Sequence, residues 1–86
     1  LFETIRVHDG RALSWKKHAD RLEGGLKALK IQVDLHILFE WLTKLVMKQN
    51  LRDGLVRIHI SRGSGGRGYL PPSKAYPLIL MEAYDL

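Results

Sequence analysis

Cysteine is absent from this chain of 86 residues, which excludes disulfide scaffolds, thiolate–zinc sites and cysteine nucleophiles. The chain also lacks an apolar run near the ~20 residues that a membrane-spanning helix needs, and its start has no signal-peptide pattern. No internal repeat and no linker divide the sequence. These absences favour a single small domain, which at this length buries roughly 60–65% of the surface of the unfolded chain.

Acidic residues are in the minority. The chain has 14 Lys and Arg against nine Asp and Glu, which gives a net charge of +5, within an otherwise globular composition of 45% hydrophobic and 27% charged residues. A basic balance favours an anionic partner, such as nucleic acid, a membrane headgroup or a phosphorylated small molecule. The charge alone does not choose among these three classes.

Hydrophobic spacing predicts the element order β-β-α-α-β-β. Alternating apolar residues predict strands over 1–8, 55–61 and 76–84, and Asp9-Gly10 predicts a type I′ turn into a short strand over 11–13. Apolar residues three and four apart predict helices over 15–29 and from 35 to about 50, with Ser14 and Asp34 as N-caps. Strands at both ends of the chain predict an α+β domain, an antiparallel sheet with two helices packed on one face. The helix positions expected to point inward are Trp15, Ala19, Leu22, Leu26, Leu29, Leu35, Leu38, Phe39, Leu42, Leu45 and Val46.

A glycine-rich segment from Ser61 to Tyr69 is the most unusual stretch of the sequence. Four of the six positions 63–68 are glycine, which favours positive backbone angles or the close approach of a ligand. Two arginines and a tyrosine in the segment could donate hydrogen bonds to an anion. A surface loop between strands and an arginine–glycine segment that binds nucleic acid are the alternatives.

On the first predicted helix, His18, Arg21 and Gly25 lie along the border of the apolar face. A glycine inside a helix costs about 1 kcal/mol relative to alanine, so Gly24-Gly25 predicts that another group packs closely there. Arg21 could hold a phosphate while its stem packs on the core, or it could pair with a neighbouring acid, Asp20 or Glu23. The four histidines lie on different elements without the spacing of metal ligands, which favours structural or solvent-exposed roles.

Three segments together resemble one known family. Leu1-Phe2-Glu3-Thr4-Ile5-Arg6-Val7 followed by Asp9-Gly10, then His18-Ala19-Asp20-Arg21-Leu22, then Ile60 to Tyr69, are similar to motifs of the class IV (fold-type IV) pyridoxal-phosphate enzymes. That family contains branched-chain and D-amino acid aminotransferases and 4-amino-4-deoxychorismate lyases. The glycine-rich segment is most similar to the lyase version, and the resemblance covers nearly the whole chain.

The resemblance implies roles for four residues. Arg21 would bind the phosphate group of pyridoxal 5′-phosphate, and Phe2 would line the substrate side of that cofactor. Arg67 and Tyr69 would contact substrate carboxylates. In the aminotransferases of the family, the matching positions are contributed to the active site of the neighbouring subunit. The implied partners are a small-molecule substrate and a second copy in a homodimer, without nucleic acid or membrane, and the implied location is the cytoplasm.

The same family holds its cofactor on a lysine of a second, larger domain, because the amine condenses with the cofactor aldehyde. None of the seven lysines of this chain matches that site. The 86 residues are therefore expected to form the small N-terminal domain of a longer enzyme, without its first strand and its C-terminal catalytic domain, and to be inactive alone. The leading hypothesis is a lyase that eliminates pyruvate from aminodeoxychorismate to give 4-aminobenzoate for folate synthesis. A D-amino acid or branched-chain aminotransferase and a small basic RNA-binding module are the alternatives.

Overall fold

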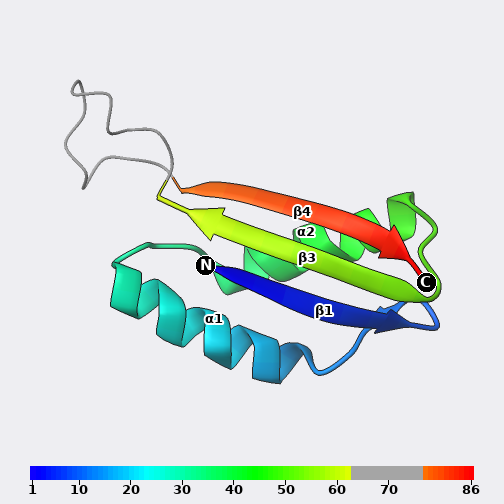
Figure 1. Ribbon diagram of the computed structural model, residues 1–86, viewed down its shortest axis with the longest axis horizontal. Coiled ribbons are helices and arrows are strands. Elements are labelled where there is room, and N and C mark those ends of the chain that lie inside the picture. The colour runs from blue at the N-terminus through cyan, green and yellow to red at the C-terminus, as the bar shows by residue number, and fades with distance from the viewer. Residues whose placement is uncertain (63–76) are drawn as a thin grey trace.

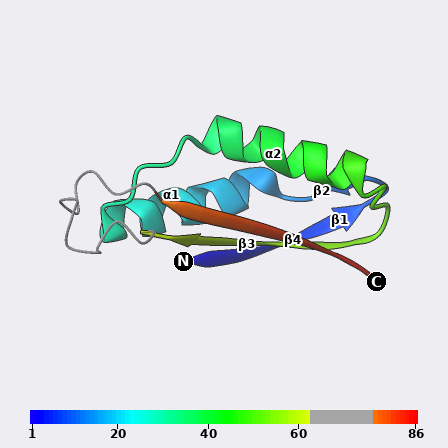
Figure 2. The same cartoon turned by 90° about the horizontal axis from the view of Figure 1, so that it is seen from above.

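The computed structural model describes residues 1–62 and 77–86. Its elements follow the predicted order: β1 (Phe2–His8), β2 (Arg11–Ala12), α1 (Trp15–Leu29), α2 (Leu35–Lys48), β3 (Gly54–Ser61) and β4 (Leu78–Asp85). The strands form one antiparallel sheet in the order β2-β1-β3-β4. Both helices lie on the same side of this sheet (Figures 1 and 2), which confirms the predicted α+β architecture.

The pairing of β1 with β3 forms the centre of the sheet. Its register runs from Phe2 opposite His59 to Val7 opposite Gly54. Alternate residues of these two strands point toward the helices, so Ile5 and Val7 on β1 are fully buried. The side chains that complete the buried core, all of them apolar, are Leu22, Leu26, Ile31, Leu38, Leu42, Val46, Leu51, Val56, Ile58 and Ile60.

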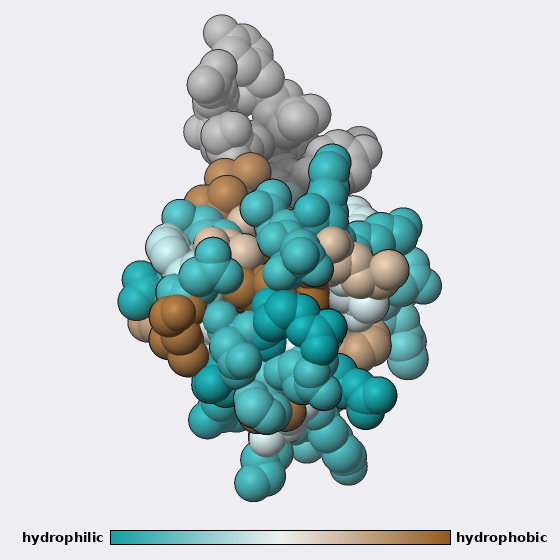
Figure 3. Space-filling view, turned by 90° about the vertical axis from the view of Figure 1, so that its right-hand side faces the viewer, coloured by the Kyte–Doolittle hydropathy of each residue, from teal (hydrophilic) through white to brown (hydrophobic). Residues whose placement is uncertain are grey.

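The turn between β1 and β2 has the predicted conformation. Asp9 and Gly10 have φ angles of 52° and 74°, and a type I′ turn requires positive φ at both central residues. The Gly10 amide donates a hydrogen bond to the carbonyl oxygen of Arg52 at 3.0 Å, which ties the turn to the chain just before β3. The molecular surface at this end is largely hydrophilic (Figure 3).

The two predicted N-caps have different outcomes. The Asp34 carboxylate accepts hydrogen bonds from the amides of His36 and Ile37 at 2.9 and 3.4 Å, as expected of an N-cap. Ser14 occupies the predicted N-cap position of α1, but the predicted capping by its hydroxyl is wrong, because the side chain makes no capping hydrogen bond and the backbone is left-handed, with a φ of 57°. A capping hydroxyl needs an extended backbone to reach the free amides of the first turn. Ser14 contributes instead through its carbonyl, which accepts the amide of His18 at 3.2 Å.

Two helix residues expected to point inward are exposed. Leu29 lies in the last turn of α1, and Phe39 lies at the edge of the apolar face of α2, where its ring packs against Trp15 with 5.0 Å between centroids. The predicted end of α2 is also two residues late. Asn50 adopts a positive φ of 51°, and the Leu51 amide bonds back to the Val46 carbonyl at 2.9 Å, so the helix ends at Lys48. No helix in the described ranges is both long and apolar enough to cross a bilayer.

Candidate functional site

Glu3, His18 and Arg21 form a polar cluster between β1 and α1. Glu3 lies near the start of β1 on its helix-facing side, and the Oε1 atom of Glu3 is 2.6 Å from Nδ1 of His18. The same oxygen accepts a hydrogen bond from Nη2 of Arg21 at 2.5 Å. The side chains of Glu3 and His18 are each only 12% exposed. The cluster therefore places a largely desolvated carboxylate beneath an arginine.

Arg21 stays mostly in solvent although it is anchored at one nitrogen. Its side chain is 66% exposed, and a guanidinium group carries five N–H donors. The local pairing considered from the sequence, with Asp20 or Glu23, is wrong, because Arg21 pairs across to β1 and Glu23 pairs with Lys27 at 3.2 Å. The Arg21 guanidinium is thus a fixed cation with donors available to an anion from outside.

Close packing against the double glycine of α1 occurs at one of the two positions. A Cβ atom added to Gly25 would lie 2.6 Å from Cδ1 of Leu1, whereas one added to Gly24 would meet nothing within 4 Å. Gly25 therefore lets the beginning of the chain approach the helix, as predicted, and Gly24 does not have that role. The contact holds β1 against α1 within one helical turn of Arg21.

Phe2 lies on the opposite, helix-free face of the sheet. Its side chain is 68% exposed, and its ring stacks on that of His59 with 6.2 Å between centroids. Nε2 of His59 lies 3.2 Å from Oε1 of Glu82, within ion-pair distance but without the alignment of a hydrogen bond. Tyr84 donates to Oε2 of Glu82 at 3.0 Å, and this hydrogen bond raises the pKa of the phenol above its ordinary 10.0. Three strands thus build an aromatic and polar surface beside Phe2.

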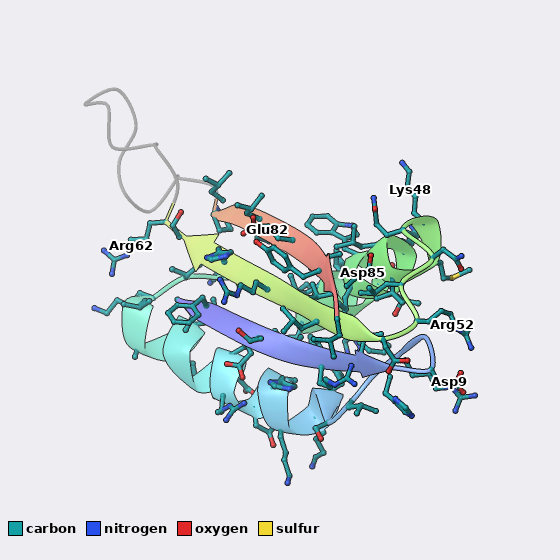
Figure 4. All side chains as sticks on the ribbon, turned by 45° about the vertical axis from the view of Figure 1, so that its right-hand side comes forward. Asp9, Lys48, Arg52, Arg62, Glu82 and Asp85 are labelled. Carbon is teal, nitrogen blue, oxygen red and sulfur yellow. The ribbon has the colours of Figure 1, made fainter. Side chains whose placement is uncertain are left out.

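The two candidate residues in the described ranges, Phe2 and Arg21, lie near the same end of β1 but on opposite sides of the sheet, because Phe2 packs on His59 and Arg21 pairs with Glu3 on the helix side. The Ile60 amide donates to the Leu1 carbonyl at 2.7 Å, so the start of β1 lies beside the end of β3. Arg62 follows β3, and its Nη2 donates to the carbonyl of Leu29 at the end of α1 at 2.7 Å. Figure 4 shows Arg62 at the other end of the molecule from Asp9 and Arg52. Arg67 and Tyr69 lie outside the described residues.

Three of the four histidines lie close to carboxylates, and the backbone amide of the fourth, His36, donates to the helix cap Asp34. His8 lies 2.9 Å from Asp53, His18 and His59 pair as above, and the amide of His36 bonds to Asp34. In residues 1–62 and 77–86, no group of three potential metal-ligating side chains comes together.

Glu3 is the residue that the sequence interpretation missed. The alternation of strand residues could have identified it, because Glu3 lies on the same helix-facing side of β1 as Ile5 and Val7. A carboxylate in a row of buried residues needs a charged or hydrogen-bonding partner. His18 and Arg21, at the border of the apolar face of α1, supply the partners that Glu3 needs.

Comparisons with known proteins agree on one family. The family described as amino-transferase class IV matches residues 1–85. An aminodeoxychorismate lyase of Vibrio harveyi is 32% identical over 85 residues, covering 98% of this chain and 31% of that protein. The crystal structure of 4-amino-4-deoxychorismate lyase from Pseudomonas aeruginosa has a TM-score of 0.84 and 33% identity, covering 99% of this chain and 31% of the other. A D-alanine aminotransferase of Staphylococcus epidermidis is 26% identical over 90 residues, covering 99% of this chain and 32% of that protein. The chain thus spans about a third of the length of each of these relatives.

Proposed function

Since the chain belongs to the class IV aminotransferase family, we propose that it forms part of a pyridoxal-phosphate-dependent 4-amino-4-deoxychorismate lyase. The lyase reaction eliminates pyruvate from 4-amino-4-deoxychorismate and leaves 4-aminobenzoate. Similarity over nearly the whole chain to two proteins named as this lyase supports the choice within the family. We also propose that the chain is the small N-terminal domain of a longer protein, and that residues beyond these 86 supply the cofactor lysine.

The observation that carries the proposal is the anchored, outward-facing guanidinium of Arg21. A phosphate group needs a cation with several N–H donors in a fixed orientation. Arg21 offers this arrangement because Glu3 holds one Nη atom while most of the side chain remains exposed. The donor set of this chain therefore fits the phosphate of pyridoxal 5′-phosphate.

Phe2 supplies an apolar surface near the same end of β1. Pyridoxal 5′-phosphate, when bound, stabilises negative charge that develops on the substrate carbon next to the amine. Phe2 is proposed to cover the substrate side of the cofactor and to exclude water there, and its stacking on His59 limits the positions of its ring. A large apolar side chain with this exposure is available for such a contact without rearrangement of the sheet.

Arg67 and Tyr69 are proposed to bind substrate carboxylates, following the resemblance of their segment to the family. A carboxylate accepts bidentate hydrogen bonds from arginine and a further bond from a phenol. We also propose that the enzyme is a homodimer in which this segment reaches the active site of the partner subunit. The isolated 86-residue chain is expected to show no turnover.

The cofactor role of Arg21 can be tested against a matched arginine. Arg52 is also 66% exposed and also pairs with a carboxylate, that of Asp9, at 2.5 Å, but it lies beside the turn at the far end of β1. In the longer protein, Arg21→Gln is expected to weaken the binding of pyridoxal 5′-phosphate by about 10- to 100-fold, the contribution of a hydrogen bond between charged groups. Arg52→Gln should leave it unchanged. Absorbance titration of the apoenzyme measures both, and equal effects of the two substitutions would contradict the proposal.

An aminotransferase is the second candidate, and the match to a D-alanine aminotransferase over 99% of the chain favours it over unrelated enzymes. Product analysis separates the two reactions. The proposed lyase forms 4-aminobenzoate and pyruvate from aminodeoxychorismate without an added oxo acid. An aminotransferase forms a new amino acid from 2-oxoglutarate and an amino donor. An absence of any cofactor absorbance band in the longer protein would exclude both enzymes and favour a binding module.

A further inference from the structure

We propose that Glu3 is a positioning residue, which acts through Arg21 to orient a phosphate-binding guanidinium. This inference rests on the proposed function, because it concerns how Arg21 binds a phosphate ester. Glu3 itself would not touch the ligand. Its carboxylate lies on the helix-facing side of β1, under the guanidinium that faces solvent.

Burial explains why Glu3 can hold another side chain in place. The Glu3 side chain is 12% exposed and belongs to a strand whose neighbouring inward residues, Ile5 and Val7, are fully buried. A carboxylate that has lost most of its water must recover hydrogen bonds from protein donors. Glu3 does so with His18 and Arg21, at 2.6 and 2.5 Å. Both donors come from one face of α1, so the ion pair also fixes the helix against β1.

The geometry around His18 determines where one proton lies. An ionised carboxylate only accepts hydrogen bonds, so the short contact with Glu3 requires that Nδ1 of His18 carries the hydrogen. Nη2 of Arg21 lies 3.1 Å from the same Nδ1, and it cannot donate to a nitrogen that is already protonated. The N–H of Arg21 is therefore directed to Glu3, and His18 supports the carboxylate instead of competing for the guanidinium.

Holding Arg21 in this way has a consequence for binding. A free arginine side chain loses rotamer freedom when it binds a ligand, and an arginine that is already ordered loses less. Glu3 also carries a negative charge that repels a phosphate, but two donors already share that charge. The gain from holding Arg21 in place is therefore expected to outweigh the repulsion between Glu3 and the phosphate. A neutral residue at position 3 distinguishes the two effects, because it weakens phosphate binding if orientation dominates and strengthens it if repulsion dominates.

Glu3→Gln is the central variant, because it removes the charge and keeps the shape. The control is Glu23→Gln, which breaks an exposed ion pair with Lys27 on the same helix. In the longer protein, Glu3→Gln is expected to weaken binding of pyridoxal 5′-phosphate by about 5- to 10-fold through lost pre-organisation. Binding of pyridoxal, which lacks the phosphate, should not change, and the control should resemble the wild type for both ligands.

A second measurement uses the 86-residue chain without any ligand. In the wild type, the Arg21 Nε–H group is expected to give an ordered NMR signal, and Glu3→Gln should make it as mobile as that of an arginine that pairs with no carboxylate. Glu3→Asp keeps the charge but moves the carboxylate away from Arg21, so it should also weaken binding of the phosphate ester. This variant replaces Glu3→Gln in the test if Glu3→Gln does not fold. Unchanged or tighter binding in the Glu3 variants would overturn the inference alone. A wild type that binds the phosphate ester no better than pyridoxal would overturn the proposed cofactor site and this inference together.

Discussion

Replacing Gly54 with alanine would push a methyl group into the backbone of the adjacent strand. Gly54 begins β3 between Val7 of β1 and Asp85 of β4, and it is buried. A Cβ atom at this position would lie 2.0 Å from the carbonyl oxygen of Tyr84 and 2.8 Å from Cδ1 of Leu51. Real Cβ atoms essentially never approach another heavy atom closer than 3.0 Å, so one of the two strands must move by at least about 1 Å.

The magnitude follows from what must move. Inserting a methyl group into a packed core typically lowers the free energy of unfolding by about 1–3 kcal/mol, and the loss is smaller where a flexible side chain can move aside. The obstacle at Gly54 is a backbone oxygen in a paired strand, so the expected loss is about 3 kcal/mol. Gly24→Ala is the matched control, since its added Cβ meets nothing within 4 Å. Alanine at this helix position should stabilise the chain by about 0.5–1 kcal/mol.

Urea unfolding of the 86-residue chain, followed by far-ultraviolet circular dichroism, measures both free energies of unfolding. Gly25→Ala completes the series, because only the flexible end of the Leu1 side chain opposes it, at 2.6 Å. It should fall between the other two variants. A loss below about 1 kcal/mol for Gly54→Ala, or an equal loss for Gly24→Ala, would refute this account of how β3 and β4 pack.

Two further predictions concern charged side chains outside the proposed site. Asp34→Ala should lower the free energy of unfolding by about 1 kcal/mol through loss of the helix cap, whereas Ser14→Ala should change it by less than about 0.5 kcal/mol; equal losses in urea unfolding would contradict this assignment of the caps. The hydrogen bond from His8 lowers the pKa of the Asp53 carboxyl below its ordinary 3.8. The stabilisation from this group is therefore present above pH 3.8 and disappears as the pH falls through the lower pKa of the folded state. Asp53→Asn should give a shallower decline in stability from about pH 4 to pH 2 than the wild type, and an unchanged slope in thermal unfolding would count against the prediction.

Local patterns in the sequence were sufficient for the element order and the layer arrangement. The alternation of Val56, Ile58 and Ile60 with outward residues sets the period of β3, and Asp9-Gly10 sets the turn because few residues tolerate its backbone angles. Both signals act over a few residues. The pairing of β1 with β3, in contrast, joins residues about fifty positions apart and was not specified by the order of elements.

The errors arose where tertiary contacts decide the outcome. Ser14 has the side chain of an N-cap but a left-handed backbone, in the short connection between β2 and α1. Phe39 has the spacing of a core residue, yet it lies at the edge of the helix contact and packs on Trp15. The sequence places acidic residues next to Arg21 on its own helix, but its ion-pair partner is Glu3, eighteen residues away on a strand. Helical periodicity identifies a face of α1 and contains no information about which strand lies next to it.

The central position of β1 determines when the domain can fold. Strands β1 and β2 are synthesised before β3, but the principal partner of β1 is β3, and its pairing extends to His59. Bringing β1 and β3 together closes a loop of about fifty residues, and the chain loses conformational entropy before the sheet contacts form and compensate for that loss. During synthesis, the residues of β1 must therefore remain unpaired along the edge that β3 will occupy until β3 has been made, and the two helices are elements that can form in that interval.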